Sequence, residues 1–595
     1  MSMRSSIFVA VAFAAALGAT PFALATDMNK TLRVAFSVAE SGFDPQAASD
    51  SYSFYVCHAI FDPLYTYDYF ARPARMIPNT ADGMPQISDG GRTYTIKVKP
   101  GIYFAADPAF KGKKRELVAD DYVYSIKRIF DPKVRSYWLY LFENNLVGLD
   151  EVLARARSTG SLDYDAPIDG LRTLDKYTLR IKFKNPDYVF QWWLTFDGLA
   201  AVAREVVDAH KDESNRVTEH PVGTGAYRLA QWTRGQKIVL EANPDFLDET
   251  FPVPGAGSEP GDAALARQNA GKKLPIVGRI EIGIIEEAQP RLLTFDSGKL
   301  DYVELPSSIA GNVLTDNALK PEYAKRGIKL YRQIEPSLAF TFFNMDDPVV
   351  GGYTNDKIAL RRAISMGYDR AADIKLIANG QAVPATQPVP PGLAGFDPSI
   401  PPKNSYDPKA ARALLDKFGY KDRDGNGYRE TPDGKPLTLI KASATTNVDR
   451  SRDELWRRSM DAIGIRITFL KQKWPELNKM SEAGQLMMWN LAWISSVPDG
   501  DSFYSVLYSK NIGTSNDARL RLPEFDRLYE EARRRPDGPE RNAIYRKLTE
   551  LVQNYAPWVL GDYPYGNVLA QPWLKGYKQH SFVKNQWKYY DVNRP

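Results

Sequence analysis

The sequence predicts an α/β protein with several lobes. At 595 residues the chain exceeds the length at which one hydrophobic core normally stops growing. Short stretches that alternate polar and apolar residues are typical of strands, and stretches with the apolar spacing of helices lie between them. Their order does not follow the regular strand-helix-strand rhythm of a single doubly wound sheet.

The first residues carry the pattern of a secretion signal. Arg4 precedes the apolar run 7–17, and Ala23-Leu24-Ala25 supplies the small-x-small pattern that signal peptidase requires before Thr26. The run is too short to span a membrane, and no later segment approaches ~20 uninterrupted apolar residues. We therefore expect residues 1–25 to be a Sec signal peptide and the mature protein to be periplasmic, with no membrane span. No cysteine stands at the cleavage point, so no lipid anchor is expected.

The first half of the chain supplies several predicted strands. TLRVAF, residues 31–36, alternates as a strand and leads into a turn-rich segment. RTYTIKVKPGIYF, residues 92–104, predicts a hairpin with Pro100-Gly101 at its turn, and residues 176–186 alternate in the same way. Residues 118–130, between these two segments, have helical spacing.

Farther along the chain, the sequence predicts a surface insertion and several helices. Residues 248–275 are rich in Pro, Gly and Ala and predict a loop. Three later stretches have helical apolar spacing: 360–370, 407–420 and 540–559. Asp407 is predicted to cap the second of these helices, with Pro408 in its first turn.

The charge distribution argues against a nucleic-acid partner. The 77 basic and 72 acidic residues are interspersed, without the Lys/Arg stripe that would neutralise a row of phosphates. The run 533–535, three arginines after two glutamates, predicts a solvated helix face. Cys57 is the single cysteine, so no internal disulfide forms, and we expect its thiol to fill the core.

Residues 221–227, PVGTGAY, contain two closely spaced glycines that are compatible with a phosphate-binding loop or with a simple bend. An alternating strand follows them instead of a helix, and no Lys-Ser/Thr pair is present. The positive helix end and the metal ligand that phosphate binding requires are therefore missing. We expect a tight turn that enters a strand.

The same stretch, followed by Trp232 and by NPDF at 243–246, resembles the signature of the extracellular solute-binding proteins, family 5. This family includes the oligopeptide and dipeptide receptors of ABC importers. The resemblance continues in the family's order through six further segments: TLRVAF, YTIKVKPGIYF, VADDYVYSIKRIFDP, FTFFNMDDP, LRRAISMGYDR and KDRDGNGYRE.

The resemblance implies a two-lobed periplasmic binding protein fold of the class II or cluster C type, with an extra accessory domain in lobe I. A solute held between the lobes favours the closed state, because contacts to both lobes exist only there. The implied partner is an ABC permease with its ATPase subunits in the inner membrane, and we expect a monomer without a cofactor. The expected division is a signal peptide at 1–25, lobe I at 26–72, 202–285 and 561–595, the accessory domain at 73–201, and lobe II at 286–560.

The resemblance also points to residues 487–508 as part of the ligand site. Peptide-binding relatives read roughly "W.ADY.DP..F" there, and the first Asp of that pattern pairs with the peptide's α-ammonium. Aligning Trp493 and Phe503 with this pattern places Ser496 at the Asp position and only Asp499 at the second acidic position. A serine hydroxyl cannot neutralise a buried ammonium.

Two outcomes follow from this substitution. Either another carboxylate pairs with the ammonium, the candidates being Asp499, Asp501 and Glu40, or the ligand carries no such group. Opines, blocked or modified peptides, and sugar-like or cationic small molecules then join free peptides as candidate solutes. Trp493 is expected to be a flat apolar wall of the site or a core residue. Further candidate ligand-binding residues are Asn490, Ser495, Tyr52, Phe54 and Tyr55.

No motif indicates an enzyme. The four histidines, His58, His210, His220 and His580, are scattered singly, without the spacing of a zinc site, and no G-x-S-x-G elbow is present. We expect a binding protein, with a secreted hydrolase and a periplasmic chaperone or sensor subunit as the alternatives.

The acidic turn KDRDGNGYRE resembles part of a calcium loop. Asp422, Asp424 and Asn426 occupy its first, third and fifth positions, but Asp433 stands where a bidentate Glu is needed, and a strand replaces the exit helix. These three residues are therefore a weak candidate, and we expect no bound metal.

Overall fold

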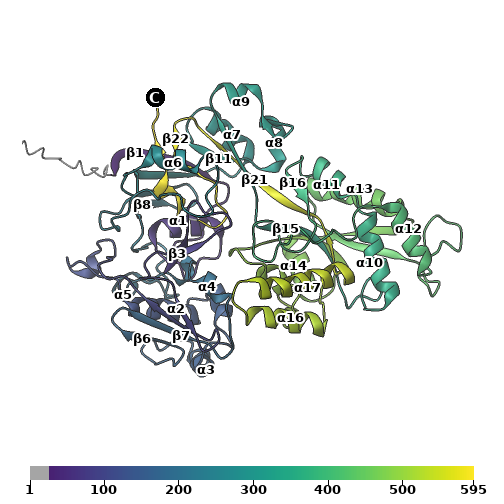
Figure 1. Ribbon diagram of the computed structural model, residues 1–595, viewed down its shortest axis with the longest axis horizontal. Coiled ribbons are helices and arrows are strands. Elements are labelled where there is room, and N and C mark those ends of the chain that lie inside the picture. The colour runs from purple at the N-terminus through teal and green to yellow at the C-terminus, as the bar shows by residue number, and fades with distance from the viewer. Residues whose placement is uncertain (1–25, 584) are drawn as a thin grey trace, which may run out of the picture.

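The computed structural model describes residues 26–583 and 585–595, so the predicted signal peptide lies outside the described residues. The chain forms a mixed α/β structure with two lobes and an accessory domain (Figure 1). Among the described residues, none of the helices combines the length and the apolar composition needed to cross a bilayer.

Lobe I is built on one four-stranded sheet. Its strands are β1 (Asp27–Phe36), β10 (Val277–Ile284), β9 (Lys237–Ala242) and β8 (Tyr227–Thr233), in that order. β1 and β10 are parallel, and the other neighbours are antiparallel. Helix α1 (Ser51–Ile60) contacts β8 and begins at Asp50, whose side chain accepts a hydrogen bond from the backbone N–H of Ser53.

The accessory domain carries an antiparallel sheet. Its strands follow the order β4 (Gln86–Ser88), β5 (Thr93–Lys97), β7 (Thr178–Lys182) and β6 (Leu171–Asp175). Helix α2 (Ala119–Phe130) packs on β6 and β7, and α3 (Leu149–Thr159) lies at the lower edge in Figure 1. The predicted hairpin at Pro100-Gly101 is wrong. β5 pairs with β4 and β7, and beyond the turn Tyr103 forms only an isolated bridge with Glu116.

Lobe II contains a five-stranded mixed sheet, in the order β18 (Arg466–Lys471), β17 (Thr438–Ser443), β19 (Met488–Ile494), β15 (Ser337–Phe343) and β20 (Trp558–Leu560). The helices predicted from spacing form here as α10 (Asn355–Gly367), α12 (Pro408–Lys417) and α17 (Pro539–Tyr555). Asp407 caps α12 as predicted, because its side chain accepts from the N–H of Ala410. The first predicted helix breaks at Asp369, which caps α11 (Arg370–Leu376).

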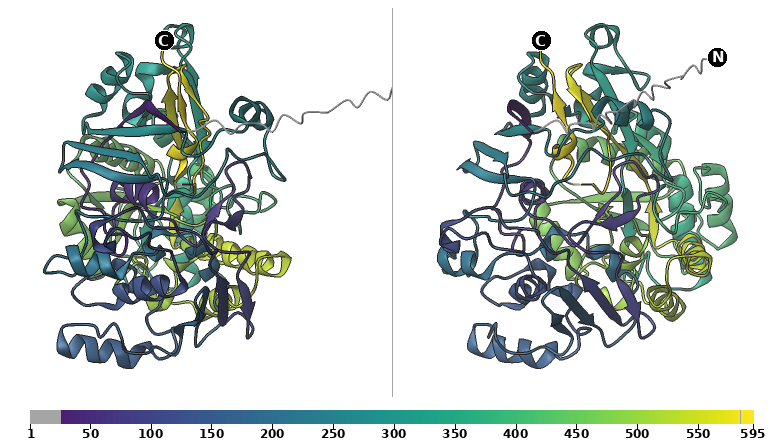
Figure 2. Two further views of the ribbon diagram at one scale, coloured as in Figure 1. Left: turned by 90° about the vertical axis from the view of Figure 1, so that its left-hand side faces the viewer. Right: turned by 60° about the vertical axis from the view of Figure 1, so that its left-hand side comes forward.

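A fourth sheet, built around β21, joins the lobes. β21 (Asp562–Ala570) pairs with β11 (Tyr302–Glu304), β14 (Lys329–Ile334) and β16 (Ala382–Pro384), and the turned views show it beside these strands (Figure 2). β21 enters from β20 of lobe II through Gly561, whose N–H donates to the Ala339 carbonyl at 2.9 Å. A Cβ at Gly561 would lie 2.7 Å from that carbonyl oxygen, so the close approach of the two backbones requires glycine.

The remaining elements complete the three parts. Those of lobe I and the accessory domain are β2 (Tyr65–Tyr67), β3 (Met76–Pro78), α4 (Phe190–Trp193), α5 (Arg204–His210), α6 (Asp262–Asn269), β22 (Leu574–Lys575) and β23 (Asp591–Val592). Those near the fourth sheet are α7 (Ala288–Asp296), α8 (Ala310–Val313), β12 (Leu314–Thr315), β13 (Ala318–Leu319) and α9 (Pro321–Lys325). Those of lobe II are α13 (Asn447–Asp461), α14 (Trp474–Glu482), α15 (Asp501–Ser505) and α16 (Pro523–Arg533). The predicted loop at 248–275 therefore contains one helix, α6.

PVGTGAY forms the predicted turn that enters a strand, here β8. A Cβ at Gly223 would lie 2.2 Å from the carbonyl oxygen of Ile60, and the N–H of Gly225 donates to the same oxygen at 2.8 Å. The two glycines thus allow the loop backbone to contact the end of α1, a packing role that requires no phosphate.

A buried ion pair fixes the accessory domain to lobe I. Arg128 of α2, which is 0% exposed, donates to Asp44 at 3.0 Å, and Asp44 also accepts from the N–H of Val217 at 2.8 Å. Burial alone would raise the pKa of Asp44, but the charge and hydrogen bonds of Arg128 outweigh this effect and lower it. Asp44 is therefore ionised, and its charge is neutralised inside the protein.

Replacing Arg128 by Met should leave the Asp44 carboxylate buried without its partner. We expect Arg128→Met to lower the free energy of unfolding by about 3–5 kcal/mol. Urea unfolding followed by tryptophan fluorescence measures this loss. The matched control is Arg157→Met, which removes an exposed pair with Glu143 and should cost less than about 1 kcal/mol. An equal loss in both variants contradicts this role of the buried pair.

Candidate functional site

Strand β19 and the loop that follows it carry the predicted site residues of lobe II. β19 runs antiparallel to β15, with Trp493 opposite Leu338. Beyond the strand, the N–H of Ser495 donates to the Pro336 carbonyl at 2.8 Å, and the N–H of Gly500 donates to that of Ala394 at 2.9 Å. These bonds fasten the stretch to the segments that line the cleft.

The side chains of this stretch have different surroundings. The half-buried indole of Trp493 donates from Nε1 to the Ser502 hydroxyl at 3.1 Å. Asn490 accepts from the Thr341 hydroxyl at 3.2 Å. Ser495 is buried and donates to the Val497 carbonyl at 2.6 Å, whereas Ser496 is exposed. Of the two serines, only Ser496 presents its side chain to solvent.

Asp499 is fully buried and paired within lobe II. Arg541 lies 2.8 Å from its carboxylate, and the Tyr545 hydroxyl donates to it at 2.6 Å. The Arg541 charge neutralises the carboxylate, so an ammonium would have to displace a buried partner to reach it.

The neighbouring Asp501 belongs to a contact between lobe II and the accessory domain. Arg533, at the end of α16, lies 3.2 Å from Asp501 and also pairs with Asp187 of the accessory domain. The Arg533 carbonyl accepts from the N–H of Tyr188 at 2.9 Å. Burial raises the pKa of Asp501, and Arg533 opposes that rise. We call this group of four residues the interlobe contact.

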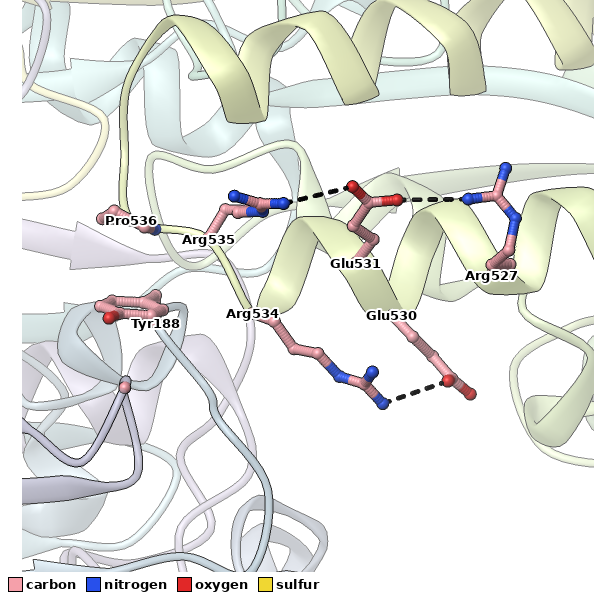
Figure 3. A pocket seen from close by; sticks show the side chains of 8 residues that line it. Tyr188, Arg527, Glu530, Glu531, Arg534, Arg535 and Pro536 are labelled. Atoms are coloured by element: carbon pink, nitrogen blue, oxygen red, sulfur yellow. Dashed lines mark hydrogen bonds and ion pairs between the residues drawn. The ribbon is translucent and has the colours of Figure 1, made fainter.

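The interlobe contact corrects the prediction for the arginine run 533–535. Arg533 turns inward between two carboxylates, whereas Arg534 and Arg535 remain at the surface and pair with glutamates of α16. A recess of about 630 Å³ adjoins these residues, and Figure 3 shows Tyr188 of the accessory domain facing the end of the helix across it. The solvated face predicted from sequence therefore holds for two of the three arginines.

The predicted lobe I residues divide into core and cleft positions. Phe54 is 8% exposed and packs edge-on against Trp138 with ring centroids 5.7 Å apart, so it is a core residue. Glu40 is 5% exposed; it accepts from the Trp232 indole and from the N–H of Gly235 at 3.0 Å. Its carboxylate thus holds the turn between β8 and β9.

Tyr52 and Tyr55 lie together on α1, packed against the core. Their ring centroids are 6.1 Å apart, and both rings contact Phe36. Burial raises the pKa of Tyr55 well above its usual value, and the carboxylates of Glu304 and Glu335 contribute to the rise. Two acidic side chains from the joining segments therefore lie near this tyrosine.

A cavity of about 830 Å³ lies between the C-terminal tail of lobe I and the segments that lead into lobe II. This volume is in the range of small-molecule sites. Its lining includes Arg72, Pro73, Ala74, Glu259, Asp262, Leu265, Tyr331, Arg332, Gln333, Ile334, Pro336, Pro391, Gly392, Leu393, Tyr577, Lys578, Gln579, His580, Ser581 and Phe582. None of the nine ligand-binding residues predicted from sequence lines this cavity within the described part of the chain. One of them, Ser495, is connected to it, since its N–H donates a hydrogen bond to the carbonyl of the lining residue Pro336.

A chain of aromatic side chains connects the cavity with Tyr55. Tyr331 and Tyr577 of the cavity wall have ring centroids 4.4 Å apart, and Tyr577 lies 5.7 Å from Tyr302. The Tyr302 hydroxyl accepts from the Trp587 indole at 2.8 Å, and Trp587 lies 6.4 Å from Tyr55. Tyr577 and Trp587 are 5% and 3% exposed, so this chain of rings is part of the packed core behind the cavity.

The cavity wall carries three basic side chains, Arg72, Arg332 and Lys578, and two acidic ones, Glu259 and Asp262. Lys578 is paired with Glu259 at 2.6 Å and with Asp262 at 2.7 Å. Arg332 donates to the neutral amide of Gln381 at 2.7 Å and lies 3.7 Å from the ring centroid of Tyr565. Arg72 donates to backbone carbonyls, and burial lowers its pKa. Sequence patterns did not identify these residues, because they come from four separate segments without a shared motif.

In the weak calcium-loop candidate, the aspartate carboxylates accept hydrogen bonds from backbone N–H groups of the same turn. The Asp422 carboxylate accepts from the N–H groups of Gly425 and Gly427 at 2.7 and 2.9 Å, and Asp424 accepts from Asn426. The turn is therefore stabilised by these bonds, as expected for a structural hairpin.

Comparison with known proteins places this geometry in a family. Residues 75–515 match the family model for bacterial extracellular solute-binding proteins, family 5. The chain is 25% identical to di/tripeptide-binding protein 2 of Pseudomonas aeruginosa, over 93% of this chain and 92% of that protein. It is 26% identical to heme-binding protein A of Haemophilus influenzae, over 84% and 81% of the two chains.

A solved structure has the same fold. The periplasmic binding protein DppA from Helicobacter pylori, in complex with peptide STSA, superposes with a TM-score of 0.69 at 22% sequence identity and covers 95% of this chain and 98% of its own. The predicted two-lobed periplasmic binding protein fold is confirmed. With three quarters of its length matched by the family model, the chain belongs to the bacterial extracellular solute-binding proteins, family 5.

Proposed function

We propose that this protein captures a peptide or peptide-like solute in the cleft between its lobes and delivers it unchanged to an ABC permease in the inner membrane. The observation that carries the proposal is the position of the 830 Å³ cavity, whose walls come from lobe I and from the segments entering lobe II. A solute there contacts both sides, so binding favours the closed arrangement.

The interlobe contact supplies part of the closed state. Asp187 and Tyr188 belong to the accessory domain, and Arg533 belongs to lobe II, so their bonds exist only when the two sides meet. A contact of this kind stabilises the closed arrangement without touching the solute. The permease would then recognise the closed form.

The charges of the cleft favour a solute with an anionic group. Arg332 and Arg72 face the cavity, and a carboxylate such as a peptide C-terminus would pair with a guanidinium there. The carboxylates proposed from sequence as ammonium partners are engaged elsewhere: Asp499 with Arg541, Asp501 with Arg533, and Glu40 with Trp232.

These engagements support a second candidate solute class. A solute without a free α-ammonium, such as a blocked or modified peptide or an opine, requires no carboxylate at Ser496. A free peptide would instead need to place its ammonium near Tyr55, where Glu304 and Glu335 contribute negative charge. The known relatives bind different classes, since one is named for di/tripeptides and another for heme.

Further parts of the proposal follow from the family and the sequence. We propose a Sec-exported, periplasmic monomer without a cofactor or catalytic activity. We also propose the lobe division 26–72, 202–285 and 561–595 against 286–560, with 73–201 as the accessory domain. The sheets of lobe I, the accessory domain and lobe II fall within these ranges and support this division.

The solute that co-purifies from the native host tests the proposal directly. Native mass spectrometry should detect one small molecule per chain, and its mass decides between a free peptide and a blocked or non-peptide solute. Adding the same solute to the emptied protein should reduce the radius of gyration in X-ray scattering. Saturation without compaction, or recovery of a chemically altered solute, contradicts the proposal.

The interlobe contact should contribute to affinity. Arg533→Gln removes the guanidinium that joins Asp187 to Asp501, so we expect the Kd for the co-purified solute to rise by about tenfold, equivalent to about 1.4 kcal/mol. Isothermal titration calorimetry measures it. The matched control is Arg534→Gln, which loses only a pair with Glu530 in its own helix and should leave the Kd unchanged. Equal Kd values for the two variants refute this role.

Trp493 should matter more for binding than for stability. Its ring is half-buried near the end of β19, two residues before Ser495, which donates a hydrogen bond to the cavity-lining Pro336. Trp493→Ala should therefore raise the Kd by more than about tenfold while lowering the melting temperature of the empty protein by only a few degrees. Trp474→Ala, on an indole that is 58% exposed in α14, is the control and should change neither quantity appreciably. A large loss of melting temperature without a change in Kd would make Trp493 a core residue.

A further inference from the structure

Three side chains with metal-ligating atoms meet at the junction of lobe I and the accessory domain, away from the cleft residues described above. They are Asp107, His210 and His220, and their ligand atoms all lie within 4.8 Å of one another. The chain contains only four histidines, so half of them are in this group. The sequence did not reveal the group, because Asp107 is more than a hundred residues from both histidines.

Each member is held by a different element. Asp107 caps the short 3-10 turn Pro108–Phe110 and accepts from the N–H of Ala109 at 2.9 Å. His210 is the last residue of α5, which packs against that turn. His220 immediately precedes PVGTGAY, the loop that packs on the end of α1. The three positions are therefore fixed by separate parts of the fold.

Both imidazoles direct Nε2 toward the same carboxylate. Nε2 of His220 lies 2.7 Å from one oxygen of Asp107, and Nε2 of His210 lies 3.6 Å from the other. The two rings are stacked, with centroids 3.6 Å apart and planes inclined by 18°. A hydrogen bond from His220 to Asp107 explains the orientation of the His220 ring. It does not explain why the His210 imidazole also points toward the Asp107 carboxylate.

We propose that Asp107, His210 and His220 form a binding site for a divalent late first-row transition metal, with Zn²⁺ as the representative ion. Two imidazole nitrogens and one carboxylate oxygen are a donor set that Zn²⁺ accepts, with water completing a tetrahedral shell. The ion would replace the contacts between the histidines and Asp107, because its ligand distances of about 2.0–2.2 Å place it between the three groups.

The exposure of the three side chains fits this role. The Asp107 side chain is 4% exposed and is oriented by Ala109, so it is the fixed ligand. The side chains of His210 and His220 are 31% and 41% exposed, so each can rotate from the stacked arrangement toward a shared ion at little cost and remain accessible to it. Binding would clamp α5 and the loop before PVGTGAY to the Asp107 turn.

Zn²⁺ titration of tag-free, chelator-treated protein tests this site. Calorimetry should show one Zn²⁺ per chain, and Zn²⁺ should raise the melting temperature. His210→Gln and His220→Gln should each weaken Zn²⁺ binding by at least about tenfold and abolish the thermal shift. Co²⁺ bound to the wild-type protein should give the intense visible absorption of a tetrahedral ion, and both variants should lose it.

Two controls keep the result specific. Glu219→Gln changes an exposed carboxylate next to His220 that is outside the group, and it should bind Zn²⁺ as the wild type does. Because both histidines are surface-accessible, the metal-free melting temperatures of all three variants should match that of the wild type. Half-saturation above about 1 mM Zn²⁺, or unchanged affinity in both histidine variants, overturns the proposal.

Discussion

The guanidinium of Arg533 is the interaction that joins the accessory domain to lobe II. It lies between Asp187 of the accessory domain and Asp501 of lobe II, while the Arg533 backbone carbonyl accepts the N–H of Tyr188. Its position between two carboxylates offsets the cost of removing these charges from water. None of the four residues of this contact lines the 830 Å³ cavity. The interlobe contact and the cavity wall therefore use different residues.

Arginine side chains pair with the acidic residues of the 487–508 stretch. Asp499 pairs with Arg541, and Asp501 shares Arg533 with Asp187. Both carboxylates therefore already have a cationic partner, and Ser496 carries no charge. The cavity wall contributes Arg332 and Arg72, and also Lys578 paired with Glu259 and Asp262. The two arginines are the basic groups of this wall that have no carboxylate within ion-pair distance in the described residues.

Sequence patterns predicted the local elements better than the site. Asp407 at the start of α12 and the turn of PVGTGAY depend on neighbouring residues, so their signals are local. The hairpin at Pro100-Gly101 failed because β5 pairs with β7, about eighty residues away, a partner that alternation cannot specify. Sequence patterns also do not reveal the cavity residues or the group around Asp107, because both are assembled from segments that are far apart in the chain. The run of three arginines predicts a solvent-exposed helix face, which holds for Arg534 and Arg535. Arg533 points inward because its partner Asp187 lies in another domain, which the local sequence does not reveal.

The accessory domain connects the two lobes through these contacts. It supplies Asp187 and Tyr188 to the interlobe contact and so touches lobe II directly, while the sheet around β21 joins lobe II to lobe I by a second route. On its other side, Arg128 of α2 is buried against Asp44, and the Trp138 indole donates to the Ala48 carbonyl at 2.9 Å. Buried, directional bonds of this kind allow little relative rotation. Because the Arg128 side chain is 0% exposed and that of Arg533 is 32% exposed, we expect the accessory domain to remain attached to lobe I if the lobes separate.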